Sequence, residues 1–174
     1  MIIESLKHRA VDITTLVPLA GNPRRGNVAA VAASLQQFGQ RKPIVVRQTD
    51  NTVVAGNHTL QAALSLGWTH IAAAFVDDTE QQAIAYALAD NRTAELGGYD
   101  MSDLAALVSS IDDQTLLTAA GYSNEDVAAL LQKIDAVEPI ADPDDVPAVK
   151  QSVSVTGDLW LLGQHRVLCG DSTS

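Results

Sequence analysis

The stretch from Thr52 to Gly67 constrains the fold of this chain more than any other. It opens with a β-branched run, Thr52–Val54, and passes through Gly56. Apolar residues then recur at the spacing of one helix face, at Leu60, Ala63, Leu64 and Leu66. Gly67 is typical of the residue just past a helix end. The pattern predicts a strand, a tight turn and a helix.

The start of this helix is a candidate anion site. Free backbone N–H groups at a helix N-terminus carry partial positive charge and favour phosphate. The side chains of Asn57, His58 and Thr59 follow the turn and stand within reach of such a ligand. Many strand-to-helix turns carry glycine and polar residues and bind nothing, so both interpretations stay open at this point.

The rest of the first hundred residues alternates between strands and helices. Strands are predicted at His8–Ile13, Pro43–Arg47, Thr52–Ala55 and Thr69–Val76. Helices are predicted at Val28–Phe38 with Asn27 as cap, and at Glu80–Glu95 behind Asp78 or Thr79. This order predicts an α/β domain over residues 1–98.

The chain changes character after residue 98. Three short helices are predicted, with caps at Ser102, Asp113 and Ser123, over Asp103–Ile111, Gln114–Ala120 and Asn124–Ile134. Leucines and valines would pack them into a small all-α subdomain, residues 99–135. Residues 136–152 hold three prolines and four acidic residues and are predicted to be an extended linker. Residues 153–174 predict a hairpin around Gly163–His165.

Charge is distributed unevenly along the chain. The net charge is −10, which argues against a broad nucleic-acid-binding face. Residues 1–47 nevertheless carry seven basic and two acidic residues, whereas 48–174 carry four basic and nineteen acidic ones. A local phosphate site in the first part of the chain fits this distribution.

Targeting signals and cysteine usage indicate a cytoplasmic protein. Residues 1–10 are interrupted by charge and lack the apolar segment of a secretory signal. No apolar run reaches the roughly 20 residues that span a bilayer. Cys169 is the only cysteine, so an intrachain disulfide is excluded. We therefore expect no membrane partner.

Four separated pieces are candidates for one shared site. They are the Asn22-Pro23-Arg24 loop, the Gly39–Ile44 turn, the Gly56–Thr59 turn and Asp90-Asn91-Arg92. Arginine forks pair with phosphate. Oxygens of Asp90 and Asn91 are ligands of the kind Mg²⁺ takes when phosphate supplies the others.

The order and spacing of these pieces over residues 10–95 resemble the ParB N-terminal domain of the ParB/sulfiredoxin superfamily. The resemblance implies a small mixed sheet with helices, and a nucleotide, CTP or ATP, bound with Mg²⁺. By position it implies nucleotide binding at Asn22, Arg24, Gly39, Arg41, Pro43, Gly56, Asn57, His58 and Thr59. It implies metal binding at Asp90 and Asn91. His58 is the candidate catalytic residue for a weak Mg²⁺-dependent NTPase. Its other role is to donate a hydrogen bond to phosphate, which we favour because no second general base stands beside it.

The chain also departs from the family pattern. Partition proteins carry Glu-Arg-Arg after the phosphate-box glycine, where this chain has Asn57-His58-Thr59. Sulfiredoxins carry their catalytic cysteine at the place of Asn57, so sulfiredoxin chemistry is excluded. Thr93-Ala94 replaces the Gln-Arg that usually follows the metal pair.

The segment Gly157–Thr173 resembles the entry into a DNA methyltransferase of the kind fused to ParB-like domains in phages and prophages. The catalytic Asp/Asn-Pro-Pro-Tyr of those enzymes is absent, so the chain is not expected to methylate DNA by itself. The expected partners are a nucleotide and, through a fused or partner methyltransferase, DNA, with a homodimer as an open assembly state.

Two other functions remain as alternatives. One is a DNA-binding specificity module without nucleotide chemistry, in which residues 99–135 would contact DNA. Against it, these residues carry only Lys133 as a basic residue and seven acidic ones. The other is a ParB-like nuclease, for which the sequence shows no convincing cluster of carboxylates and histidines.

Overall fold

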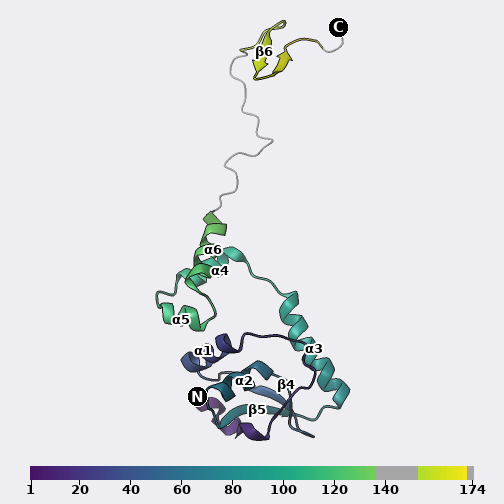
Figure 1. The fold of residues 1–174 in the computed structure, drawn as a ribbon, viewed down its shortest axis with the longest axis vertical. Coiled ribbons are helices and arrows are strands. Elements are labelled where there is room, and N and C mark those ends of the chain that lie inside the picture. Colours follow the sequence, from purple (N-terminus) through teal and green to yellow (C-terminus); the bar gives the residue numbers. More distant parts are fainter. Residues whose placement is uncertain (136–152, 172–174) are drawn as a thin grey trace. The chain divides into compact units, whose positions relative to one another are not determined.

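The computed structural model describes residues 1–135 and 153–171 (Figure 1). The chain divides into two compact units, residues 1–136 and 137–174. The predicted linker, residues 136–152, lies outside the described residues. In the parts described, no helix has both the length and the apolar character that a membrane crossing requires.

A five-stranded mixed sheet forms the base of the first unit. Its spatial order is β1-β5-β3-β4-β2. The pairs β1/β5 and β3/β4 are antiparallel, whereas β3/β5 and β2/β4 are parallel. The strand bounds are β1 Ala10–Asp12, β2 Val17–Pro18, β3 Ile44–Arg47, β4 Thr52–Ala55 and β5 His70–Val76. The predicted α/β class is confirmed.

Two helices lie together beside this sheet, as Figure 1 shows: α1, Val28–Phe38, and α2, Asn57–Ser65. Asn27 caps α1 by accepting a hydrogen bond from the Ala30 N–H at 3.0 Å. The buried core joins the inner faces of helices and strands, with Leu35, Ile44, Val46, Val53, Leu60 and Ile71 among its members. The turn before α2 therefore lies between a strand and a helix that both contribute to the buried core.

The predicted strand over His8–Ile13 is wrong for three of its six residues. Glu4–Arg9 forms a 3₁₀ helix, and only Ala10–Asp12 is a strand. Val17–Pro18 forms a two-residue strand, β2, which is not among the strands predicted from the sequence. It forms because it pairs with β4, which lies more than 30 positions later in the chain. A local sequence pattern does not predict such a long-range pairing.

The long helix α3, Glu80–Leu96, lies against β4. Thr79 and Gln82 form a reciprocal capping box at its start. Three shorter helices follow: α4 Met101–Ser109, α5 Gln114–Ala119 and α6 Asn124–Asp135. Asp100, rather than the predicted Ser102, caps α4.

These three helices share a separate apolar cluster. Its buried members are Ala105, Val108, Leu117 and Leu130. Leu107 and Leu131, which we expected in this core, are exposed. In the second unit, β6 Leu159–Leu162 and β7 His165–Leu168 form the predicted antiparallel hairpin.

Candidate functional site

The turn between β4 and α2 brings an uncapped helix start to the surface of the first unit. Gly56 has φ 91°, and a Cβ there would lie 2.5 Å from Cγ2 of Ile44, so only glycine fits. No side chain caps α2, whereas Asn27 caps α1 and Thr79 caps α3. The first N–H groups of α2 therefore have no side-chain acceptor and can accept an anion.

A cavity of about 180 Å³ lies in front of this turn. Eight of the predicted site residues line it: Asn22, Arg24, Gly56, Asn57, His58, Thr59, Asp90 and Asn91. They come from the loop before α1, the start of α2 and the C-terminal half of α3. Three of the four separated pieces of sequence therefore meet at one place.

The side chain of Asn57 is turned into the protein. It is buried, its Oδ1 accepts a hydrogen bond from the Leu19 N–H at 2.9 Å, and its Nδ2 donates to the Val53 carbonyl at 2.8 Å. Both ends of the amide are thus used internally. The backbone N–H of Asn57 is therefore the group of this residue that an anion at the helix start could contact.

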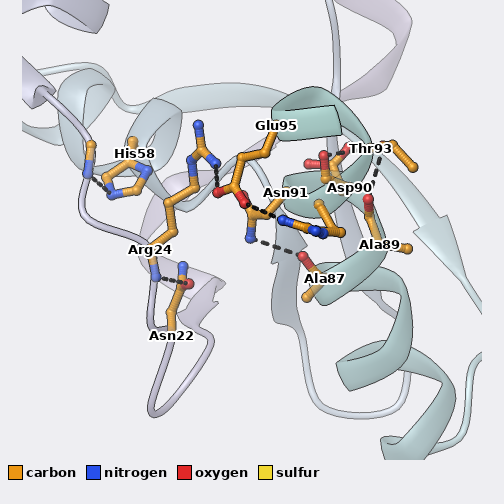
Figure 2. Close-up of polar contacts among 11 residues, drawn as sticks. Asn22, Arg24, His58, Ala87, Ala89, Asp90, Asn91, Thr93 and Glu95 are labelled. Carbon is orange, nitrogen blue, oxygen red and sulfur yellow. Dashed lines mark hydrogen bonds and ion pairs between the residues drawn. The ribbon is translucent and has the colours of Figure 1, made fainter. Parts of the chain in front are cut away.

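The ring of His58 is also engaged within the protein. Its Nε2 accepts a hydrogen bond from the Gly26 N–H at 2.9 Å. A nitrogen that accepts carries no hydrogen, so the neutral ring with hydrogen on Nδ1 fits this contact. Figure 2 shows His58 beside this loop segment, away from the α3 residues.

The Arg24 side chain extends from its loop to Glu95 on α3, as drawn in Figure 2. Its Nη1 donates to Oε1 of Glu95 at 3.2 Å, and Arg92 lies 3.6 Å from the other oxygen of the same carboxylate. Asn91 donates through Nδ2 to the Ala87 carbonyl at 2.9 Å, which leaves Oδ1 as its acceptor. The Asp90 side chain is exposed.

A second cavity, of about 410 Å³, shares Thr59 with the first. Its lining includes Gly39 and Arg41, and Arg41 packs its guanidinium 5.3 Å from the centre of the Phe38 ring. Pro43 is not among the residues that line either of these two cavities. The fourth piece of sequence therefore belongs to this neighbouring hollow.

Gln40 is a positioning residue that the sequence interpretation missed. Its side chain is 1% exposed; Oε1 accepts from the Ala72 N–H at 2.7 Å, and Nε2 donates to the Ala72 carbonyl at 2.8 Å. The amide thus pairs with β5 as a strand would. It fixes the turn between α1 and β3, and the only sequence signal is a polar residue after a helix-ending glycine.

In the described residues, the acidic side chains do not form a complete metal-binding site. Among residues 1–135 and 153–171, no three His, Cys, Asp or Glu side chains gather as metal ligands. Asp90 and Asn91 supply two oxygens at most. An ion held there would need phosphate oxygens or water to complete its shell, which is the usual case for Mg²⁺.

Comparisons with known proteins agree on one family. A model of the ParB N-terminal domain matches residues 3–92. A nucleoid occlusion protein from Geobacillus thermodenitrificans is 29% identical over 94 residues, covering 50% of this chain and 34% of the relative. A probable plasmid-partitioning protein ParB from Thermus thermophilus is 34% identical over 84 residues, covering 46% and 28% respectively. The chain thus spans about a third of these relatives.

A solved structure shares the fold. The C-terminally truncated chromosome-partitioning protein ParB from Caulobacter crescentus, complexed with CTP-γ-S, superimposes with a TM-score of 0.62. The match covers 73% of this chain and 78% of that one at 17% identity. The likeness therefore concerns the arrangement of the backbone.

Proposed function

The chain belongs to the ParB N-terminal domain family, and we propose on this basis that it is a nucleotide-binding module that takes CTP or ATP together with Mg²⁺. The phosphates occupy the cavity before α2, held by its first N–H groups, by Arg24 and by the Thr59 hydroxyl. Base and ribose extend into the neighbouring hollow beside Gly39 and Arg41.

One observation supports this proposal: the uncapped start of α2 lines a polar cavity whose lining also includes an arginine and a carboxylate–amide pair. A nucleoside triphosphate needs donors for its phosphates and oxygens for its counterion. Arg24 supplies the former, and Asp90 with Asn91 the latter. The Caulobacter ParB with this fold was solved with CTP-γ-S, which supports a cytidine nucleotide as first candidate.

The metal has a defined task in this arrangement. Mg²⁺ neutralises phosphate charge, and the Asp90 carboxylate with Asn91 Oδ1 would hold it on the α3 side of the cavity. Asn91 is already oriented by its bond to the Ala87 carbonyl. Its amide oxygen therefore points away from the helix backbone without further ordering.

Isothermal titration calorimetry with CTP, ATP, ADP and GTP tests the proposal. Binding of CTP or ATP in Mg²⁺ is expected, and it should weaken with EDTA. Arg24→Ala should reduce affinity about tenfold or more, since hydrogen bonds to charged groups contribute roughly 1.5–3 kcal/mol. Arg166→Ala, an equal charge change in the hairpin, should leave affinity unchanged.

A variant and a matched control test the proposed role of Asp90 in binding Mg²⁺. Asp90→Asn should raise the Mg²⁺ concentration needed for binding, whereas Asp103→Asn on α4 should not. No heat with any of the four nucleotides at millimolar concentration would overturn the proposal. Release of phosphate from a bound triphosphate would add NTPase activity to the binding function.

We further propose that the module serves DNA modification. The hairpin of the second unit exposes Leu159, Trp160, Leu161 and Leu168, and a lone two-stranded hairpin is marginally stable in water. An adjoining methyltransferase domain would cover this apolar surface. This link is tested by expressing the chain together with any methyltransferase reading frame found downstream of its gene. The measurement is DNA methylation that depends on S-adenosylmethionine.

A further inference from the structure

The loop that carries Arg24 is fastened to α2 at both ends. At its start, the Leu19 N–H donates to Asn57 Oδ1 at 2.9 Å. At its end, the Gly26 N–H donates to His58 Nε2 at 2.9 Å. Consecutive residues of one helix thus hold both ends of a loop that lies more than 30 positions earlier in the chain.

The contact between His58 and Gly26 is closely packed. A Cβ on Gly26 would lie 2.8 Å from both Cγ and Nδ1 of the imidazole. Gly26 has no positive φ, so the requirement for glycine here is one of space. The ring lies directly on the loop backbone, and a methyl group would push it away.

The segment between the two anchors is internally braced. Asn22 Oδ1 accepts from the Arg24 N–H at 3.1 Å, and Arg25 Nη1 donates to the Asn22 carbonyl at 2.9 Å. A shift at Gly26 is therefore passed to the backbone of Arg24. We therefore expect the position of the Arg24 side chain, which bonds Glu95, to depend on these anchors.

We propose that His58 is a positioning residue, which holds the Arg24 loop through Nε2, and neither a general base nor a main phosphate ligand. The lone pair that would take a proton is the one bonded to Gly26. The consequence for ligand affinity rests on the proposed nucleotide function. The anchoring itself is a property of the unliganded protein.

Limited trypsin digestion of the full chain without nucleotide tests the anchoring. Arg24 and Arg25 are cleavage sites inside the loop, whereas Arg47 lies in β3 and reports global unfolding. His58→Ala should speed loop cleavage roughly three- to tenfold without speeding cleavage at Arg47. His58→Gln, whose Oε1 can accept from Gly26, should restore much of the protection. Equal loop cleavage in wild type and His58→Ala would overturn the proposal.

A double-mutant cycle tests the contact itself. Gly26→Ala should loosen the loop in the wild-type background, because the new methyl collides with the ring. In the His58→Ala background the same change should add little, because the ring is gone. Additive effects would show that the two residues act independently, contrary to the proposal.

Nitrogen NMR gives a spectroscopic check. The ring of His58 should show the hydrogen on Nδ1 and an unprotonated, hydrogen-bonded Nε2 in the neutral state. The opposite tautomer would contradict the anchor.

The nucleotide experiment separates positioning from direct contact. If His58 acts through the loop, His58→Ala should weaken nucleotide binding in the wild type but have little effect in an Arg24→Ala background. A loss that persists at full size in that background would show direct ligand contact and overturn the positioning role. If the wild type binds no nucleotide, the proposed function fails, and digestion and NMR still decide the anchoring.

Discussion

Arg24 and Glu95 are 71 positions apart in the sequence, yet Nη1 of Arg24 lies 3.2 Å from Oε1 of Glu95. Both side chains are partly exposed, 40% and 54%. The Glu95 carboxylate accepts a hydrogen bond from Arg24, the arginine that we propose as a phosphate ligand. If Arg24 binds phosphate as we propose, Glu95 would compete with that phosphate for the guanidinium.

Removing this carboxylate should strengthen nucleotide binding. Exposed ion pairs contribute roughly 0.2–1 kcal/mol, so Glu95→Gln is expected to tighten the Kd by about 1.4- to fivefold. Calorimetry at low and at high salt measures it, and the gain should shrink as salt screens the pair. Glu125→Gln on α6 is the control for net charge; an equal gain there would show a general field effect.

Gln40→Leu should destabilise the first unit strongly. The change leaves the N–H and carbonyl of Ala72 buried without their partners, and each such group costs roughly 1–3 kcal/mol. Chemical denaturation should show a loss of about 2 kcal/mol or more. Gln81→Leu, an exposed position on α3, should stay within about 0.5 kcal/mol of wild type. Equal stability of the two variants would contradict this role of Gln40.

Alanine substitutions at three glycines distinguish the cost of backbone strain from the cost of a steric collision. Gly98→Ala meets neither and should be near neutral. Gly67 has φ 70° with nothing near its Cβ, so Gly67→Ala should cost about 1 kcal/mol. Gly56→Ala adds the collision with Ile44 and should cost clearly more. Thermal denaturation should rank them in this order; Gly56→Ala at the level of Gly67→Ala would refute the close approach.

Lowering the pH should reduce the stability of the fold by protonating Asp50. Hydrogen bonds from Arg47, and then from Thr52, hold the pKa of Asp50 well below its usual 3.8. A carboxyl with a lowered folded-state pKa stabilises the fold above its unfolded value and loses this contribution as pH falls through the folded value. Asp50→Asn should therefore lower Tm at pH 7, and the difference from wild type should shrink below about pH 3.8. Asp112→Asn in the loop before α5 is the control, and a difference that does not change with pH would contradict the pairing.

Local patterns predicted the elements that local chemistry determines. Asn27 and the apolar spacing after it gave the bounds of α1, and the run Thr52–Ala55 gave β4, because caps and periodicity act over a few residues. The clustering of the Asn22, Gly56 and Asp90 segments was predicted from the chemistry of their side chains together with the family resemblance. Periodicity alone would not have brought them together.

Long-range contacts account for what could not be predicted. His58 meets Gly26 32 positions earlier, and Gln40 meets Ala72 32 positions later. Both polar side chains bond backbone groups, which are present at every residue and so leave no mark in the sequence. The assignment of Asn57 and His58 as ligands followed from their place in a motif, whereas their hydrogen bonds depend on the tertiary fold.

The outermost strand β2 has only two residues, and the second is Pro18. Proline has no N–H to offer to another strand, so this side of the sheet is a poor template for edge-to-edge growth. At the opposite side, β1 is three residues long. Both edges of the five-stranded sheet are therefore short, which limits edge-to-edge pairing between molecules. The hairpin strands β6 and β7 lack this protection, since they expose apolar side chains such as Leu161 and Leu168.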